Sequence, residues 1–130
     1  MNNRELKFRV WDKEKSSFVD PACFTVTGNG LLLITDSGYW ADMQTDNYIT
    51  KSERYVVQQF TGLFDINGSR IYEGDLVSRR GSTYRYTVEW SEPEAAFMLR
   101  DWDGDLSVYL PDFINNLEVI GHLVRNNKTQ

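Results

Sequence analysis

Three aspartates near the C-terminal end of the chain, Asp101, Asp103 and Asp105, carry the side chain that binds hard metal ions. In an extended chain their alternate spacing would place the three carboxylates on one face, and carboxylate oxygens suit Ca²⁺ and Mg²⁺. The Asp103-Gly104 pair is also typical of a hairpin turn, which forms without any metal. We therefore expect no metal site in this loop, and a metal-dependent hydrolase that uses it is only the third alternative for the function.

Acid–base or nucleophilic chemistry would have to use Glu73 and Asp75, or the sole histidine, His122. Glu73 and Asp75 flank Gly74, a spacing that also fits a sharp turn in which Asp75 accepts backbone N–H bonds. The sole cysteine, Cys23, is far from His122 in the sequence, and a zinc site would need three or four such ligands. We predict no catalytic residue, no metal site and no cofactor, and we expect that the protein is not an enzyme.

Aromatic side chains are the better candidates for binding a partner. The chain has 7 Phe, 4 Trp and 7 Tyr, and small barrels use exposed aromatic faces for peptides or single-stranded nucleic acid. The other interpretation is that these side chains form the core and the cross-strand pairs. The candidate partner-binding residues lie in two neighbouring expected strands: Trp90, Trp102, Tyr84 and Tyr86.

Basic side chains concentrate at Arg79, Arg80 and Arg85, which gives the alternative function, a nucleic-acid-binding module. The net charge of −5 argues against duplex DNA, because neutralising phosphates requires clustered Lys and Arg. We expect no binding to duplex DNA, and a protein partner whose identity the sequence does not give. A second copy of the chain is one candidate, which leaves a homo-oligomer open.

The expected elements that position these residues are short strands. Residues 84–90 alternate aromatic or aliphatic side chains with polar ones, which is typical of a two-faced strand. Short strands joined by turns that contain Gly, Asn and Asp favour an antiparallel barrel or sandwich. The remaining expected elements are strands at 6–11, 18–19, 55–60, 77–79, 96–102, 106–110 and 117–124, a hairpin over 24–34, and one short helical turn at 110–116.

Residues 61–77 hold several turn signals between apolar residues, and the rest of the chain is organised around them. Gly62 is expected to break the strand that precedes it. Asn67 and Gly68 tolerate positive φ, and such a pair between apolar residues is a strong hairpin signal. Gly74 turns the chain once more before a new strand. We assign a structural role in these turns to Gly62, Asn67, Gly68, Gly74 and Asp75.

The same stretch carries a resemblance through residues 58–63, Asp65, Asn67-Gly68 and 71–77, and residues 7–12 and 117–122 add an opening and a closing strand. In this order the segments resemble the signature of the YopX family. Residues 23–48 match no part of that pattern, and variation in this region is typical of the family. The resemblance implies a small all-β protein of bacterial phages, prophages or plasmids, with a barrel of the Src-homology-3 type. It implies no reaction, because the role of the family is not established.

We predict an all-β fold, namely a small antiparallel barrel of Src-homology-3-like type with additional N-terminal strands and at most one short helical turn. Residues 1–54 would form an N-terminal β subdomain or extension, and residues 55–130 the YopX-like barrel core. The length of 130 residues also fits a single continuous domain over 1–130.

The composition indicates where the protein acts. One cysteine cannot form an intrachain disulfide, which fits a reducing cytosol. No apolar run reaches the ~18 residues that span a bilayer, and the first residues lack the apolar segment of a signal peptide. We expect a protein in the cytoplasm of a bacterial host, without membrane attachment. Its expected role is that of an accessory protein of a phage or other mobile element, a non-enzymatic protein-binding module.

Overall fold

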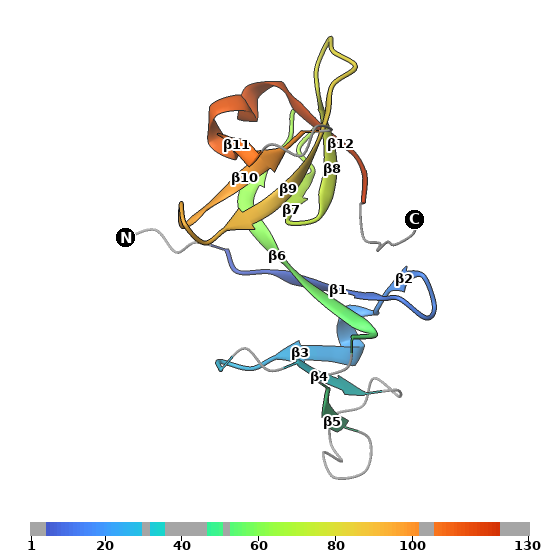
Figure 1. Cartoon of the computed structure of the whole chain (residues 1–130). Coiled ribbons are helices and arrows are strands. Elements are labelled where there is room, and N and C mark those ends of the chain that lie inside the picture. The colour runs from blue at the N-terminus through green and yellow to red at the C-terminus, as the bar shows by residue number, and fades with distance from the viewer. Residues whose placement is uncertain (1–4, 30–31, 36–46, 51–52, 102–105, 123–130) are drawn as a thin grey trace. The chain divides into compact units, whose positions relative to one another are not determined.

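The chain folds from short strands, and the predicted all-β class is confirmed (Figure 1). The computed structural model describes residues 5–29, 32–35, 47–50, 53–101 and 106–122. Within these residues the strands are β1 (Phe8–Asp12), β2 (Ser17–Phe18), β3 (Phe24–Val26), β4 (Leu32–Thr35), β5 (Asn47–Thr50), β6 (Tyr55–Phe64), β7 (Arg70–Tyr72), β8 (Asp75–Arg79), β9 (Arg85–Ser91), β10 (Ala96–Arg100), β11 (Leu106–Tyr109) and β12 (Leu117–His122).

Helical structure in the described segments is limited to two short 3-10 helices, η1 (Pro21–Cys23) and η2 (Leu110–Asn116). Each has a proline in its first turn, where the missing N–H costs no helical hydrogen bond. The helical turn predicted at 110–116 is confirmed as η2, and η1 is a second one that the sequence did not predict. No helix in these segments is long and apolar enough to cross a membrane.

The chain divides into two compact units, residues 8–58 and residues 1–7 with 59–130, which we call the 8–58 unit and the 59–130 unit. Strand β6 contributes residues to both of them. The predicted boundary between residues 54 and 55, and the alternative of one continuous domain over residues 1–130, stay predictions.

The 8–58 unit contains strand β1 paired antiparallel with β2, and a three-stranded sheet of order β3-β4-β5. Its core consists of Val10, Leu32 and Ile34. Leu32 and Ile34 are buried while Leu33 between them is half-buried, so the aliphatic run at 31–34 behaves as an alternating strand. Strand β1 begins at Phe8 rather than at residue 6, and Leu6 is exposed.

The 59–130 unit contains a five-stranded antiparallel sheet of order β11-β10-β9-β8-β12 (Figure 1). This sheet curls as a half-barrel, and a closed barrel of the Src-homology-3 type stays a prediction. The core beneath the sheet is aliphatic and almost fully buried, and its members come from β7, β8, β9, β10, η2 and β12: Ile71, Val77, Val88, Leu99, Leu110 and Leu117.

Gly62 does not break its strand, contrary to the sequence prediction. Strand β6 runs on to Phe64, and its pairing with β7 shifts between Phe60 and Phe64. Gly62 adopts a φ of 92°, which a residue with a Cβ rarely adopts. Between these two pairs β6 has two more residues than β7, and they form a bulge that lets the strand bend without ending. A glycine that ends a strand and a glycine in a bulge have the same local sequence pattern, because a bulge depends on how the partner strand pairs.

The turn between β6 and β7 is built around the buried carboxylate of Asp65, which is only 7% exposed. Its Oδ1 accepts the N–H groups of Asn67 and Ser69 at 2.8 Å each, and its Oδ2 accepts the N–H of Val119 in β12 at 2.9 Å. Gly68 closes the turn by donating to Asp65 O at 3.0 Å, with a φ of 82°. One carboxylate therefore holds both the turn and a neighbouring strand.

A second turn places Asp75 at the start of β8. Gly74 has a φ of 88°, and its N–H donates to Val88 O at 2.8 Å. The fully buried carboxylate of Asp75 accepts the N–H of Tyr72 through Oδ2 at 2.8 Å. This is the backbone-binding role that the sequence predicted for Asp75.

Replacing Gly68 or Gly74 by valine tests the turns. The β-branched side chain clashes with the backbone at positive φ, so we expect each substitution to lower the free energy of unfolding by about 1–3 kcal/mol. Urea denaturation followed by circular dichroism measures the effect. Gly28→Val is the control, because Gly28 has no positive φ and a Cβ there meets nothing within 4 Å. Equal stability of Gly68→Val, Gly74→Val and the wild type would contradict a structural role for these two glycines.

Replacing Asp65 by asparagine tests the carboxylate itself. The amide keeps one acceptor oxygen but turns an NH₂ group toward the N–H of one former donor, so two donors face each other in a buried place. We expect a loss of about 2 kcal/mol in the free energy of unfolding. Asp20→Asn is the matched control, because Asp20 accepts one exposed N–H, from Ala22, and asparagine caps as well as aspartate. A loss of the same size in both variants would contradict the special role of Asp65.

Candidate functional site

Trp90 is the exposed aromatic side chain around which a binding site can be built. In the hairpin of β9 and β10, Trp90 pairs with Phe97, and their rings meet edge to face with centroids 5.1 Å apart. Val88, two residues earlier on the same face of β9, is buried in the core. Trp90 extends beyond that core and is 47% exposed.

A hollow of about 220 Å³ lies beside this pair and is lined by Gln59, Glu73, Trp90 and Phe97. Two hydrogen bonds to Gln59 fix the position of Glu73. The Glu73 N–H donates to Gln59 O at 2.9 Å, and Glu73 Oε1 accepts the Gln59 N–H at 3.0 Å. The hollow therefore joins an indole, a phenyl ring, a carboxylate and an amide. We call it the Trp90 pocket.

The other aromatic candidates do not join the Trp90 pocket. Tyr84 is 64% exposed but precedes the opposite end of β9, roughly 20 Å along an extended strand from Trp90. Tyr86 packs against the core of the unit, as the alternative interpretation of the aromatics has it. Trp102 lies outside the described residues. The four candidate residues therefore do not form one face in the described part of the chain.

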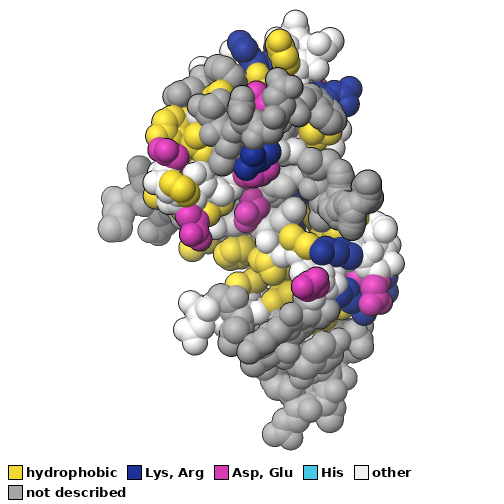
Figure 2. Space-filling view, in the orientation of Figure 1, with side chains coloured by type: hydrophobic (Ala, Val, Ile, Leu, Met, Phe, Trp, Pro, Cys, Tyr) yellow, Lys and Arg dark blue, Asp and Glu magenta, His cyan; other side chains and the backbone are white. Residues whose placement is uncertain are grey.

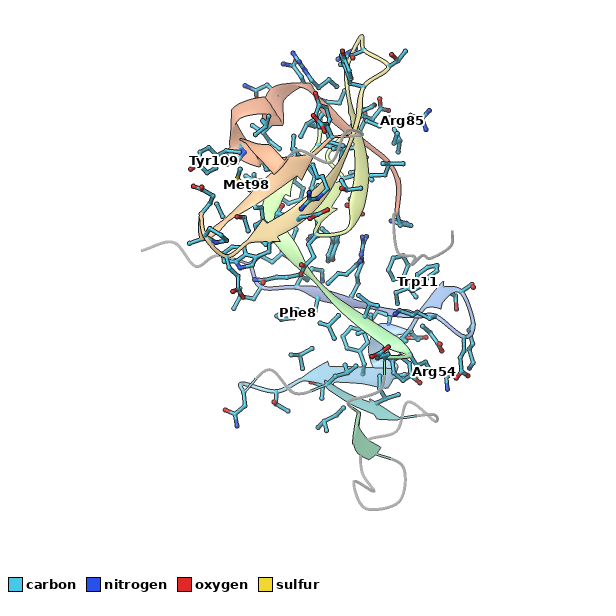
Figure 3. All side chains as sticks on the ribbon, viewed as in Figure 1. Phe8, Trp11, Arg54, Arg85, Met98 and Tyr109 are labelled. Carbon is cyan, nitrogen blue, oxygen red and sulfur yellow. The ribbon has the colours of Figure 1, made fainter. Side chains whose placement is uncertain are left out.

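The arginine candidates lie around the hairpin of β8 and β9. Arg79 is half-buried at the end of β8, while Arg80 and Arg85 are exposed. Arg85 points away from the sheet (Figure 3) and lines an open hollow of about 350 Å³ with hydroxyl side chains, on a partly apolar floor: Ser78, Ser82, Thr83, Leu76 and Ile120. A guanidinium among hydroxyl groups is an arrangement suited to a phosphate.

The candidate metal ligands and the histidine form no metal-binding group in the part of the chain that the structure describes. Within that part no group of three or more His, Cys, Asp or Glu side chains is placed to hold a metal ion. Asp103 and Asp105 lie outside it, so the loop from Asp101 to Asp105 is not described as a whole. His122 Nδ1 lies 3.2 Å from Asp75 Oδ1, so this histidine adjoins a carboxylate that also binds the backbone.

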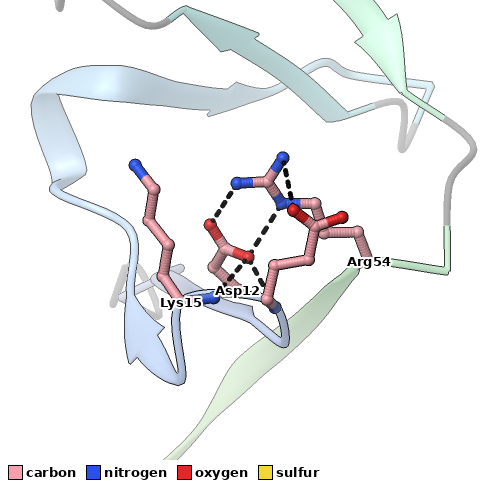
Figure 4. Close-up of polar contacts among 4 residues, drawn as sticks. Asp12, Lys15 and Arg54 are labelled. Atoms are coloured by element: carbon pink, nitrogen blue, oxygen red, sulfur yellow. Dashed lines mark hydrogen bonds and ion pairs between the residues drawn. The ribbon is translucent and has the colours of Figure 1, made fainter.

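A clamp between Arg54 and Asp12 in the 8–58 unit was not expected from the sequence (Figure 4). Arg54 Nε and Nη2 donate to Asp12 Oδ1 and Oδ2 at 2.9 Å each, and Nη1 lies 3.3 Å from Glu14 Oε1. The hydrogen bonds from Arg54 lower the pKa of Asp12 although burial opposes this, and the same bonds raise the pKa of Arg54. The clamp borders a hollow of about 240 Å³ that also reaches Cys23.

Trp90 was one of the candidates named from the sequence, whereas the other residues that line the hollow were not named as binding candidates. Phe97 was within reach, because a hairpin between two expected strands places residues opposite one another. Gln59 and Glu73 come from a distant strand and turn, and no local pattern connects them to Trp90. Arg54 and Asp12 are 42 residues apart in the sequence and were missed for the same reason.

Comparison with known proteins adds the family. A family model described as YopX protein matches residues 7–128. Two similar solved structures are protein EF1440 from Enterococcus faecalis, with a TM-score of 0.54, 19% identity and coverage of 92% of this chain and 94% of that chain, and protein yopX from Bacillus subtilis, with a TM-score of 0.53, 18% identity and coverage of 91% and 97%.

These two likenesses show the shared fold alone, because both identities are below 25%. No curated protein matches the chain significantly. The family model, by contrast, extends over nearly the whole sequence, from the opening strand to the segment beyond β12. The resemblance inferred from the turn motif and the two outer strands is confirmed, and the chain belongs to the YopX family.

Proposed function

We propose that this chain is a non-enzymatic protein-binding module of a phage or other mobile element, which acts in the cytoplasm of a bacterial host and binds its partner at the Trp90 pocket. The observation that carries the proposal is the exposed Trp90 beside a preformed hollow. Tryptophan is enriched among the few residues that dominate binding energy in protein interfaces. Membership of the YopX family supports the genomic setting.

The pocket is suited to binding because its walls are held in place. Trp90 rests against Phe97, and Glu73 is bound to Gln59 through two backbone-directed hydrogen bonds. Such a site loses little conformational entropy when a partner enters it. Almost half of the Trp90 surface is in water before binding, so covering it gains hydrophobic free energy.

The structural role of two buried carboxylates supports the proposal that the module is non-enzymatic. Among the residues of the 59–130 unit whose burial is described, Asp65 and Asp75 are the acidic groups most removed from water, and both accept backbone N–H groups. A carboxylate that holds a turn in this way supports the fold and is poorly placed to exchange protons with a substrate.

Capture of a partner from bacterial lysate tests this function. We expect the wild-type chain to retain a protein partner at moderate salt, because buried apolar area is not screened, and Trp90→Ala to lose it. Tyr84→Ala is the matched control, since it removes a more exposed aromatic side chain outside the pocket. Circular dichroism melts establish that all three proteins are folded. Equal retention by Trp90→Ala and the wild type would contradict the proposal.

A second candidate function, binding to single-stranded nucleic acid, is favoured by Arg85 and the hydroxyl-lined hollow at the β8–β9 hairpin. Arg80 adds a second exposed cation to that hairpin. It ranks below protein binding because the net charge of −5 opposes the approach of a polyanion.

Fluorescence anisotropy with labelled oligonucleotides separates the two functions. We expect no measurable binding to duplex DNA near physiological salt, because too few phosphates would be neutralised. Binding of single strands through the hairpin would weaken steeply with salt and would be lost when Arg79, Arg80 and Arg85 become serine together. Tight binding that survives moderate salt in the wild type and disappears in this triple variant would make nucleic acid the partner.

A further inference from the structure

The hollow at the β8–β9 hairpin lies at the opposite end of β9 from the Trp90 pocket, and the two share no lining residue. Arg85 and Ser78 are opposite each other in β9 and β8, and Leu76 lies on the same face of β8 as Ser78. Val77 between them is buried, so the hollow lies on the face of the sheet that is turned away from the core. In Figure 2, Lys and Arg side chains lie at the end of the 59–130 unit from which this hairpin projects in Figure 1.

Arg85 has no acidic partner in the part of the chain that the structure describes. Arg54, Arg70 and Arg100 each form an ion pair with a carboxylate. Arg80 and Arg85 are exposed, and neither side chain forms a hydrogen bond or an ion pair with a described residue. Of these two, only Arg85 lines the hollow. Its guanidinium is therefore available to an anion from solution.

Three hydroxyl side chains share the hollow with this guanidinium, namely those of Ser78, Ser82 and Thr83. The hairpin turn holds Ser82 in place, because its N–H donates to Arg79 O at 3.0 Å and its Oγ accepts the N–H of Tyr84 at 3.0 Å. Since this Oγ is an acceptor there, its hydroxyl hydrogen can still donate to a ligand. None of the described residues that line the hollow is acidic. The hollow thus presents one cation and three hydroxyl donors.

A phosphate monoester satisfies this set of donors better than a carboxylate does. The phosphate carries a charge of about −1.5 to −2 near neutral pH and has three acceptor oxygens that point in different directions. The planar fork of one guanidinium is enough for both oxygens of a carboxylate, which would leave the hydroxyl groups without a ligand. A tetrahedral phosphate accepts hydrogen bonds from the guanidinium and from hydroxyl groups beside it. The donors therefore favour a phosphate.

The floor of the hollow adds an apolar requirement. Leu76 is half-buried and Ile120 is 41% exposed, and a phosphate alone would leave both side chains in water. The volume of about 350 Å³ lies near the lower end of the range of roughly 300–1,000 Å³ that is typical of small-molecule sites. The flat face of a nucleobase can cover these two aliphatic side chains while its phosphate reaches Arg85.

We propose that the hollow beside Arg85 binds a nucleoside monophosphate, with the phosphate on Arg85 and the three hydroxyl groups and the base on Leu76 and Ile120. This inference goes beyond the proposed protein-binding function, because it uses no residue of the Trp90 pocket. One nucleotide also meets less repulsion from the net charge of −5 than a strand with many phosphates does.

Glu118 limits the affinity. It is opposite Ser78 in β12, although its carboxylate accepts a hydrogen bond from the side chain of Asn67 at 3.3 Å and does not line the hollow. A negative charge at this distance repels the phosphate, and the open site leaves part of the ligand in water. We therefore expect a dissociation constant of about 1 mM.

Nuclear magnetic resonance of the ¹⁵N-labelled full-length chain tests the site, because it detects weak binding and locates it. Adenosine 5′-monophosphate should shift the amide signals of Ser82, Thr83 and Arg85 in a saturable way. Adenosine, which lacks the phosphate, and O-phosphoserine, which lacks the base, should each bind about tenfold more weakly. Equal binding of either compound and the nucleotide would overturn the proposal, as would the absence of saturable shifts at about 10 mM nucleotide.

Two arginine variants separate a site from the effect of charge alone. We expect Arg85→Gln to raise the dissociation constant of adenosine 5′-monophosphate about tenfold, and Arg80→Gln to change it less than about twofold. Arg80→Gln is the matched control, because it removes the same charge from the same hairpin outside the hollow. Thr83→Val keeps the shape of the side chain without the hydroxyl group and should weaken binding about threefold. Equal weakening by the two arginine variants would overturn the proposal.

A free nucleotide and the 5′ end of a single strand present the same chemical group, and a short oligodeoxyadenylate with and without a 5′-phosphate distinguishes these sources. Equal affinity of the phosphorylated strand and the mononucleotide supports the free nucleotide. Tighter binding of the strand that depends on its 5′-phosphate supports a strand end. Tighter binding that is the same without the 5′-phosphate and weakens steeply with salt would overturn this inference and support the second candidate function. Capture of a lysate partner through Trp90 is independent of all three results.

Discussion

The carboxylate of Asp65 is the interaction on which the 59–130 unit depends. It accepts three backbone N–H groups, two from its own turn and one from β12, while it is almost completely buried. A buried ionised carboxylate costs several kcal/mol unless hydrogen bonds replace the lost water. The turn and the strand must therefore both be in place for Asp65 to be tolerated. Ile66 adds a further link, because its N–H donates to Leu117 O at 3.0 Å, and together these bonds cover the backbone of β12, an edge strand of its sheet.

The same turns position the pocket. After the turn at Asp65, β7 leads into a second turn, in which Gly74 is bound to Val88 O in β9 and Asp75 to the N–H of Tyr72. Glu73 lies inside this second turn, and its reciprocal bonds with Gln59 connect it to β6. Residues 61–77, to which the sequence assigned only a structural role in turns, thus also supply Glu73 to the wall of the Trp90 pocket.

Local stereochemistry explains which features could be predicted from the sequence. Gly68 and Gly74 were assigned to turns because positive φ favours glycine wherever the chain reverses, and both positions have it. Gly62 also has positive φ but lies in a bulge, and the difference depends on how β6 pairs with β7, which no local pattern encodes. The pocket and the clamp between Arg54 and Asp12 required contacts between residues far apart in the sequence. Strand alternation predicted the face on which Trp90 lies, but not that the core ends before it.

The exposure of Trp90 follows from where the core ends. Val88 and Trp90 share one face of β9, and their partners Leu99 and Phe97 share the corresponding face of β10. Val88 and Leu99 are buried in the aliphatic core and Phe97 packs against it, whereas Trp90 extends past it and is exposed. An apolar surface of this kind binds many partners weakly if nothing else distinguishes them. Glu73 also lines the hollow beside the aromatic pair, so a partner that enters it must match a polar group as well as an apolar surface, which adds specificity.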